Sequence, residues 1–283
     1  MNIGIIASQN RSVVPGSGLS PATIDTAPFT ATTQFSGVTK NMMVRYPEGY
    51  DQNDNHNCLI FLHGIGEFGT TANEIWLNGF AKEIQANNTT ILNELDRLGI
   101  VAIFPQQPSQ TFWGGGSGGD GWSEPYLLDI ITWAKTLKID KITVGGLSMG
   151  GGGAVRLAYE NYTEFYKVLA MCPQSSTSYA SIYAENLPVW VFHGQNDSMT
   201  GFGSGASSAF IDAIKDYIAA NPGTGIYPPK FSYITGGDHS SAWIKPSQEI
   251  GFAASELSLD IHGNGKDPAG LTNGVGILDW CFN

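Results

Sequence analysis

The sequence predicts an α/β fold in which a mostly parallel sheet has helices on both faces. Several apolar runs have the length of a strand and are continuous rather than alternating, as in strands that are buried on both faces; residues 58–63 (CLIFLH) and 100–105 (IVAIFP) are two examples. Segments with helical spacing separate these runs, and the alternation repeats at least four times, which is the pattern of a parallel sheet with crossover helices. The length of 283 residues suits one domain of this class.

The elements follow in chain order. Residues 1–36 are rich in Ser, Thr, Pro and Gly and predict an extended arm with short strands, and residues 37–283 predict the α/β domain. Residues 246–273 interrupt the alternation and predict an insertion or an irregular tail before a closing helix within 275–282 (VGILDWCF). In the domain, strands are expected from residue 40 to the turn at 47–49 and at 58–63, 100–105, 141–147, 167–172, 189–193 and 230–235, and helices within 73–98 and at 124–137, 150–160 and 206–220.

The composition limits the partners and the location. Hydrophobic residues make up 42% of the chain and charged residues only 14%, and the net charge is −11. The chain has no run of Lys or Arg, so nucleic-acid binding has no support, and it has no apolar run long enough to span a bilayer. The low charge favours an extracellular or particle-associated protein. The N-terminal residues lack the features of a secretory signal, which leaves a cytoplasmic location open.

Neither a metal nor an organic cofactor is expected. Cys58, Cys172 and Cys281 are odd in number and widely spaced, so they predict buried free thiols, and no paired Cys/His spacing supports a zinc site. Residues 51–55 (DQNDN) begin like a calcium loop, but His56 stands where such a loop needs Gly. A polar turn is the better interpretation.

One serine lies in a pattern typical of a nucleophile. Ser148 stands between Gly146 and Gly150, after a predicted strand and before a predicted helix, which is the context of a nucleophile elbow. The turn strains the serine backbone, and side chains two residues before and after it would collide, so both positions require Gly. Residues 151–153 are also Gly. Each costs up to about 1 kcal/mol in a helix relative to Ala, so they predict close packing of this helix on the sheet.

A serine hydroxyl needs a base, and the chain has five histidines. His239 follows the strand at 230–235, which places it at the carboxyl edge of the sheet with Ser148. His63 and His193 each end a strand before a Gly and are expected to support loops. The remaining two, His56 and His262, lie in the polar turn and in the tail.

The base needs an acid that orients it. Asp197 follows the strand at 189–193 and so lies at the same edge, whereas Asp238 is adjacent to His239 in sequence and is expected to be a turn residue. The chain order Ser148, Asp197, His239 is that of one hydrolase architecture.

Two backbone N–H groups complete the predicted site as an oxyanion hole. One is that of Met149, directly after the serine, and the second is that of Ile65 in the loop 62–69 (LHGIGEFG), which follows an early strand. Glu67 in this loop is expected to be a structural anchor rather than a catalytic acid.

These segments together resemble a known family. "YPEGYD", "LIFLHGIGEFG", "IFPQQP", "DKITVGGLSMGGGGAVRLA", "LPVWVFHGQND" and "GGDHSSAW" cover roughly residues 40–245 and resemble the α/β-hydrolase superfamily. Within it, the chain is most similar to bacterial esterases of the polyhydroxybutyrate-depolymerase-like, feruloyl-esterase-like and dienelactone-hydrolase-like groups. The resemblance implies a Ser148–Asp197–His239 triad and an oxyanion hole at Ile65 and Met149. The arm, the tail and the missing export signal depart from the family pattern and leave location and oligomeric state open.

Three tryptophans are candidates for a substrate pocket. Residues 112–122 (FWGGGSGGDGW) lie at the catalytic edge, and Trp113 or Trp122 is expected to pack against the acyl or sugar part of a substrate. Ordinary packing onto the helix at 124–137 is the alternative for this pair. Trp243, close after His239, is expected to border the same pocket.

The sequence therefore predicts a serine carboxylic-ester hydrolase that acts through an acyl-enzyme. Its substrates would be acetyl or feruloyl esters of carbohydrates, or small acyl esters. Two alternatives remain: a serine peptidase of the same fold, and a structural or binding module of an extracellular particle that retains the hydrolase scaffold.

Overall fold

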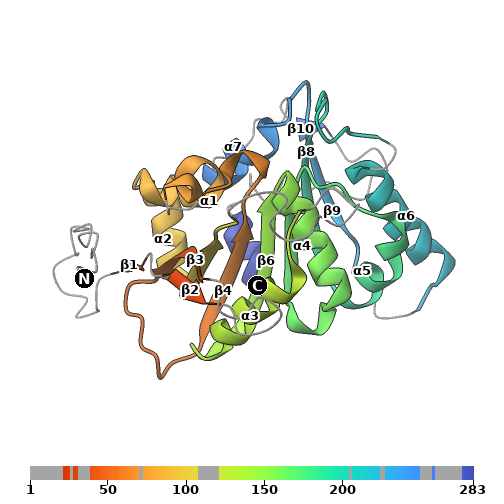
Figure 1. Cartoon of the computed structure of the whole chain (residues 1–283). Coiled ribbons are helices and arrows are strands. Elements are labelled where there is room, and N and C mark those ends of the chain that lie inside the picture. The colour runs from red at the N-terminus through yellow and green to blue at the C-terminus, as the bar shows by residue number, and fades with distance from the viewer. Residues whose placement is uncertain are drawn as a thin grey trace.

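The structure, a computed structural model, is described for residues 22–25, 28–30, 39–69, 73–107, 121–203, 206–223, 227–248, 257–258 and 276–283. Within them a ten-stranded sheet runs through the molecule with helices on both faces (Figure 1), which confirms the predicted α/β class. The strands are β1 (Thr23–Asp25), β2 (Pro28–Thr30), β3 (Thr39–Tyr46), β4 (His56–Leu62), β5 (Ile100–Pro105), β6 (Ile139–Leu147), β7 (Lys167–Met171), β8 (Val189–Gly194), β9 (Lys230–Ile234) and β10 (Leu257–Ser258).

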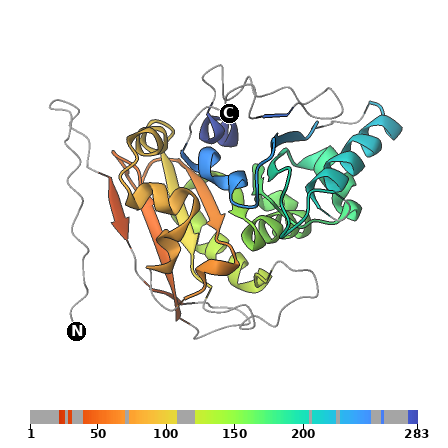
Figure 2. The same ribbon diagram turned by 90° about the horizontal axis from the view of Figure 1, so that it is seen from above.

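The helices form two layers. Side chains of α3, α4, α5 and α6 pack on one face of the sheet, and side chains of α1, α2, α7 and α9 pack on the other. Seen from above, α9 and the pair α3 and α4 lie on opposite sides of the strands (Figure 2). The bounds are α1 (Gly79–Gln85), α2 (Thr89–Arg97), α3 (Glu124–Lys135), α4 (Met149–Glu160), α5 (Ala180–Asn186), α6 (Ser207–Ala220), α7 (Ser241–Gln248) and α9 (Ile277–Phe282), with short 3-10 turns at Ile65–Glu67, Glu74–Leu77, Tyr162–Glu164 and Thr177–Tyr179.

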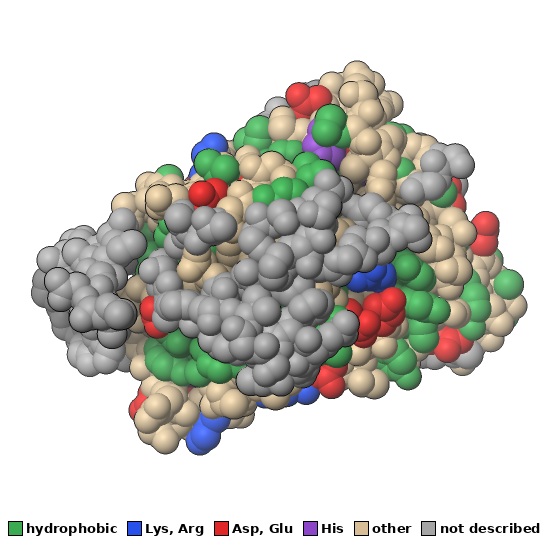
Figure 3. Space-filling model, viewed as in Figure 1, with side chains coloured by type: hydrophobic (Ala, Val, Ile, Leu, Met, Phe, Trp, Pro, Cys, Tyr) green, Lys and Arg blue, Asp and Glu red, His purple; other side chains and the backbone are tan. Residues whose placement is uncertain are grey.

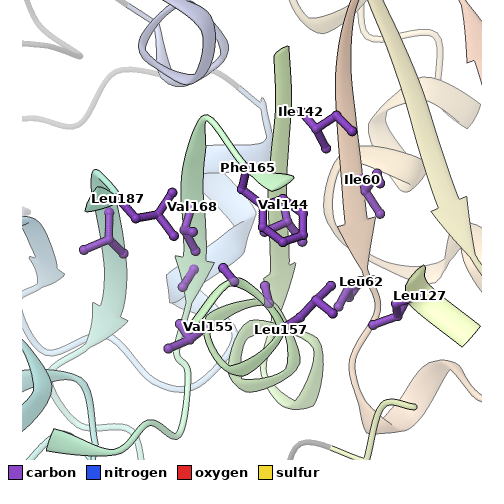
Figure 4. Packing of buried hydrophobic residues seen from close by; sticks show 14 of the residues in the cluster. Ile60, Leu62, Leu127, Ile142, Val144, Val155, Leu157, Phe165, Val168 and Leu187 are labelled. Carbon is purple, nitrogen blue, oxygen red and sulfur yellow. The ribbon is translucent and has the colours of Figure 1, made fainter. Parts of the chain in front are cut away.

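The continuous apolar strands serve both layers, because successive side chains of a strand point to opposite faces. In β4, Ile60 and Leu62 belong to the core under α3 and α4, whereas Leu59 and Phe61 belong to the core under α1 and α2. Figure 4 shows the first of these cores, in which helix side chains, Leu157 among them, meet the strand side chains. A strand used on both faces has no polar face, which explains the absence of alternation in its sequence.

The sheet order contains a switch point at β4. The order is β1-β3-β5-β4-β6-β7-β8-β9-β10, with β2 paired to β3. The strands from β5 to β9 in this order are parallel, and the flanking β1, β2, β3 and β10 are antiparallel. From β4 the chain goes first to β5 on one side and then to β6 on the other. Ligands of open α/β sheets bind where the strands end at such a switch point.

Most predicted elements are present at their expected positions. Sequence reasoning did not predict the short helix α5 or α7, which contains Pro246. The described part of the predicted arm forms β1 and β2, which pair with β3. The predicted insertion lies almost entirely outside the described residues. Cys58, Cys172 and Cys281 are buried free thiols, as expected. None of the described helices has the length and apolar character that a membrane span requires.

The predicted closing helix is α9, and side chains of the sheet hold its C-terminal end. Thr143 Oγ1 donates to the Cys281 carbonyl at 2.7 Å, and Lys141 and Lys167 donate from Nζ to the carbonyls of Phe282 and Trp280, each at 2.7 Å. The last carbonyls of a helix lack partners within the helix and carry partial negative charge, so these donors stabilise its end.

Candidate active site

Ser148 occupies the turn between β6 and α4 in a strained conformation. Its φ is 54° and its ψ is −121°, a positive φ that costs a non-glycine residue about 1 to 3 kcal/mol. A Cβ on Gly146 would lie 2.3 Å from the Gly150 carbonyl oxygen, and a Cβ on Gly150 would lie 2.1 Å from that of Leu62. Both positions therefore exclude any side chain, as the sequence predicted for an elbow.

The glycines after the elbow also lie at close contacts. A Cβ on Gly151 would lie 2.6 Å from the Met171 carbonyl oxygen, which confirms close packing of α4 on the sheet. At Gly153 the neighbour is different, because a Cβ there would lie 2.8 Å from the ring of Trp122. Gly153 therefore makes room for the Trp122 ring beside α4, whereas Gly151 makes room for the sheet.

A continuous hydrogen-bond chain joins Ser148, His239 and Asp197. His239 Nε2 lies 2.9 Å from Ser148 Oγ, and His239 Nδ1 lies 2.6 Å from Asp197 Oδ2. Because Asp197 can only accept when ionised, Nδ1 carries the proton and Nε2 is free to accept one from the serine. The three residues come from the ends of β6, β8 and β9, so the parallel sheet brings them to one edge.

Asp197 is held as a buried, ionised acid. Its side chain has no exposed surface. Burial raises its pKa, but hydrogen bonds from His239, the Thr200 hydroxyl and the backbone N–H groups of Met199 and Thr200 outweigh burial, and the net pKa lies below its ordinary value. Asp238 is not a member of the hydrogen-bond chain formed by Ser148, His239 and Asp197. Its carboxylate accepts from Ser240 and Ser241 at the start of α7, as a turn residue would.

The loops that carry the acid and the base are tied together. Asn196 N–H donates to the Gly237 carbonyl at 2.8 Å, and Gln195 N–H donates to that of Ile234 at 3.0 Å. A Cβ on Gly194 would lie 2.0 Å from the Asp238 carbonyl oxygen. The end of β8 and the loop before His239 can approach this closely only because residue 194 is Gly.

The loop after β4 lies against the elbow, and buried groups fix its path. His63 Nε2 accepts from Gln107 N–H at 3.0 Å and its Nδ1 donates to the Gly64 carbonyl at 2.7 Å. Glu67 is 2% exposed, and its Oε2 accepts from Gly64 N–H at 2.8 Å, which confirms its role as an anchor. Burial lowers the pKa of His63 to about 4 and raises that of Glu67 to about 7. Both residues line a cavity of about 10 Å³, room for one water molecule.

This arrangement bears on the predicted oxyanion donors. A Cβ on Gly64 would lie 3.4 Å from the Ser148 Cβ, so this backbone runs beside the nucleophile. The Gly64 N–H is already used by Glu67, which leaves the next one, that of Ile65, for a ligand. The Met149 N–H belongs to the first turn of α4, where N–H groups have no partner within the helix. Ile65 and Met149 as oxyanion donors remain a prediction.

The three candidate tryptophans have different fates. Trp243 lies edge-on to the His239 ring with centroids 5.1 Å apart and is half-buried, so it borders the base. Trp122 is only 3% exposed; its ring contacts His63, with centroids 4.8 Å apart, and its Nε1 donates to the His63 carbonyl. This burial against His63 and beside Gly153 of α4 corrects the expectation of a pocket wall; packing was the alternative, but it was expected on the helix at 124–137. Trp113 lies outside the described residues.

Three exposed apolar side chains, called here the apolar rim, lie on segments that carry predicted site residues. Ile65, Met199 and Ile244 are 43%, 67% and 47% exposed, and they belong to the segments that carry the predicted oxyanion donor, the acid and the base. Figure 3 shows a histidine beside hydrophobic side chains at the edge where the parallel strands end. This rim favours contact with an apolar group.

Two further residues lie close to the hydrogen-bond chain of Ser148, His239 and Asp197. The sequence did not predict that they would. His193, expected to support a loop, is fully buried and its Nε2 lies 3.1 Å from Asp197 Oδ2. Cys172, directly after β7, has a φ of 42°, and its Sγ lies 4.0 Å from His239 Nε2. Among the described residues, Cys172, Asp197 and His239 are the one group whose ligand atoms lie close enough to hold a metal ion. The hydrogen bonds above already engage two of its members.

Comparisons with known proteins assign the chain to a family. The family model Esterase, described as "Putative esterase", matches residues 36–216. The chain belongs to the Esterase family. It is therefore a carboxylic-ester hydrolase of the α/β-hydrolase fold, as the resemblance implied. No curated protein sequence matches the chain.

Solved structures of esterases share the fold. A thermostable esterase is 21% identical with a TM-score of 0.57, over 80% of this chain and 60% of that one, so the chain spans well under the full length of that protein. The feruloyl esterase module from Clostridium thermocellum is 16% identical with a TM-score of 0.55, over 80% and 84%. A fluorophosphonate-binding serine hydrolase from Staphylococcus aureus is 13% identical with a TM-score of 0.54, over 81% and 96%.

Proposed function

We propose that this esterase works through an acyl-enzyme, with Ser148 as nucleophile, His239 as general base and Asp197 as the acid that orients His239. The observation that carries the proposal is the unbroken chain from Asp197 Oδ2 through both nitrogens of His239 to Ser148 Oγ, with separations of 2.6 and 2.9 Å. The strained backbone of Ser148 adds to it, because such strain persists where the surrounding structure imposes it.

In the acylation step, Ser148 Oγ attacks the ester carbonyl carbon while His239 Nε2 takes the hydroxyl proton. The carbonyl oxygen becomes an oxyanion that the N–H groups of Met149 and Ile65 would stabilise, and each such donor is worth about 3 kcal/mol in acyl transfer. The oxyanion collapses, the bond to the alcohol oxygen breaks, and the alcohol leaves with the proton from His239. Water then attacks the acyl-enzyme by the same route, which releases the acid and restores Ser148.

For the substrate we propose an ester with an aromatic acyl group, such as a feruloyl ester of a carbohydrate, ahead of acetyl and other small acyl esters. The apolar rim of Ile65, Met199 and Ile244, together with the half-buried ring of Trp243, supports this order. An apolar group placed there would bury surface that is now exposed to water, which is worth about 25 cal/mol per Å².

A fluorophosphonate probe and a panel of esters test the proposal. The wild-type protein is expected to be labelled at Ser148, as mapped by peptide mass spectrometry, and to hydrolyse feruloyl esters with a higher kcat/KM than acetyl esters. Ser148→Ala should lose the label and at least about 10⁴-fold in kcat. An unlabelled wild-type protein without turnover would refute the mechanism, and an acetyl preference would refute the order of substrates alone.

A further inference from the structure

A second serine–histidine pair contacts the same carboxylate oxygen of Asp197 as His239 does. His193, at the end of β8, has no exposed surface, and its Nε2 lies 3.1 Å from Asp197 Oδ2. Its Nδ1 lies 2.6 Å from the hydroxyl of Ser207, the buried first residue of α6. Five side chains thus form one series, Ser148–His239–Asp197–His193–Ser207, with the aspartate at its centre.

The contacts of His193 determine which nitrogen carries its proton. Nε2 lies 3.1 Å from the Asp197 carboxylate and 3.5 Å from the Thr200 hydroxyl, which itself donates to Asp197. A bare lone pair facing the carboxylate would be repelled, so Nε2 must be protonated. Nδ1 is then an acceptor, and the Ser207 hydroxyl, which lies 2.6 Å from Nδ1 and 3.5 Å from the Pro173 carbonyl, donates to the nearer Nδ1. Because Ser207 begins α6, the ring is fixed by a helix as well as by its own strand.

His193 is also neutral, so it does not compete with His239 for the negative charge. Burial lowers its pKa to about 4, and the nearby Asp197 raises it only in part. The titratable groups that act on it most strongly are Asp197 and His239 themselves. A neutral N–H dipole stabilises the carboxylate and leaves the charge of Asp197 available for the imidazolium that forms on His239.

We infer that His193, fixed by Ser207, is a positioning residue that holds the Asp197 carboxylate in place for His239. Oδ2 is the oxygen that accepts from His239, and His193 and Thr200 meet that same oxygen from other directions. With these partners the carboxylate cannot rotate away from His239 without losing further contacts. The inference rests on the proposed function, since it assigns a part to His193 only if Asp197 orients His239.

Substitution of His193 separates positioning from folding. His193→Phe removes the N–H but keeps an aromatic ring, and we expect kcat for an aryl ester to fall about tenfold with KM unchanged, because the buried ring cannot reach a substrate. His193→Gln keeps an N–H group near the position of Nε2 and should recover most of the loss. In His193→Phe, the downfield NMR signal of the proton between His239 and Asp197 should broaden or move upfield.

A matched control breaks another buried hydrogen bond near the same strand. Ser232 on β9 is 6% exposed and accepts from Trp190 Nε1 at 3.1 Å, away from Asp197. Ser232→Ala should lower stability and leave kcat and the downfield signal unchanged. A His193→Phe variant that behaves like Ser232→Ala, or a Gln variant that recovers nothing, would overturn the inference. An inactive, unlabelled wild-type protein would instead refute the proposed function.

A measurement on the wild-type protein tests the protonation of His193 without reference to activity. With ¹⁵N-labelled histidine, His193 should show a protonated Nε2 and a bare Nδ1, and it should remain neutral from pH 8 to about 5, above its pKa of about 4. Comparison with His193→Gln or, if needed, Ser207→Ala spectra assigns the signal. A protonated Nδ1 or an imidazolium at neutral pH would overturn the inference without reference to activity.

Discussion

Two strand ends in this esterase carry the same dipeptide, His-Gly, and use it differently. His63-Gly64 follows β4 and His193-Gly194 ends β8. Both rings are buried, and burial lowers both pKa values to about 4. His63, however, bonds only to backbone groups, those of Gly64 and Gln107, whereas His193 meets the side chains of Asp197 and Ser207.

The difference extends to the position of the proton. His63 accepts at Nε2 from Gln107 N–H and therefore carries its proton on Nδ1. His193 faces a carboxylate at Nε2 and therefore carries its proton there. The His63 ring fixes the path of the loop beside the nucleophile, whereas the His193 ring contacts the charged carboxylate of Asp197. The segment after β5 offers a backbone amide to His63 and the loop after β8 offers an acid to His193, so the surroundings and not the dipeptide determine the role.

The largest effect is expected when the negative charge of Asp197 alone is removed. Asp197→Asn should lower kcat about 10⁴-fold, because an amide can present an N–H group to the donors around it and His239 loses the partner that keeps its proton on Nδ1. The loop at His63 should be unaffected, so the melting temperature should change little although kcat is almost lost. Steady-state kinetics and calorimetry measure the two.

Asp238→Asn is the matched control for this experiment. Asp238 stands next to His239 in sequence but accepts only from Ser240 and Ser241. Its substitution should change kcat less than about threefold, in keeping with a surface position. Equal losses in the two variants would contradict the assignment of Asp197.

On the loop beside the nucleophile, the expected effect is on stability. The folded-state pKa of His63, about 4, lies below the ordinary 6.5. The unfolded chain therefore binds more protons between these values, and the contribution of His63 is present above pH 6.5 and lost as the pH falls toward 4. His63→Gln should remove a pH-dependent loss of about 3 kcal/mol over this range, as measured by urea unfolding. A slope equal to that of the wild type would show that His63 is not neutral when buried.

Much of the fold follows from the sequence. Continuous apolar runs such as 58–63 and 100–105 have the length of a strand and no polar side, as strands buried on both faces do. The helix α5 was not predicted, because its seven residues are too few for a clear period. The predicted trio Ser148, Asp197 and His239 meets because strand exits of a parallel sheet share one edge.

Other parts of the site depend on contacts that the sequence does not encode locally. Ser207 begins a helix and meets His193 only through the packing of α6 against the sheet. Trp122 was a candidate for a pocket wall, with packing onto the helix at 124–137 as the alternative; Gly153 leaves room for its ring beside α4, and the ring is buried. The glycine run in the sequence indicated close packing of α4, but it did not indicate that Trp122 would be the neighbour of Gly153.

A further test uses the second titratable group on the loop at His63. Burial raises the pKa of Glu67 from 4.5 to about 7. The folded state then binds more protons between these values, so the contribution of Glu67 is present below pH 4.5 and lost as the pH rises to 7. Relative to wild type, Glu67→Gln should gain about 2 to 3 kcal/mol in unfolding free energy between pH 5 and 8.

The two slopes oppose each other between pH 4.5 and 6.5, where His63 and Glu67 act on the same loop. The double variant His63→Gln/Glu67→Gln should therefore have a stability that depends on pH in this range about as little as that of the wild type. The loop at His193 has no such opposing acid, because the pKa of Asp197 is lowered. A double variant steeper than both single variants would contradict this account.

The smallest expected effect compares the tryptophans beside His239 and His63. Trp243 borders His239 and is half-buried, whereas Trp122 is buried against His63. Trp243→Ala should raise KM for a feruloyl ester about two- to tenfold, the worth of one aromatic contact, and should leave KM for an acetyl ester unchanged. Trp122→Phe should change neither KM and should lower only the melting temperature. If Trp122→Phe alters KM selectively for the aromatic ester, the aromatic group contacts the loop at His63. The assignment of Trp243 to substrate binding and of Trp122 to packing would then be wrong.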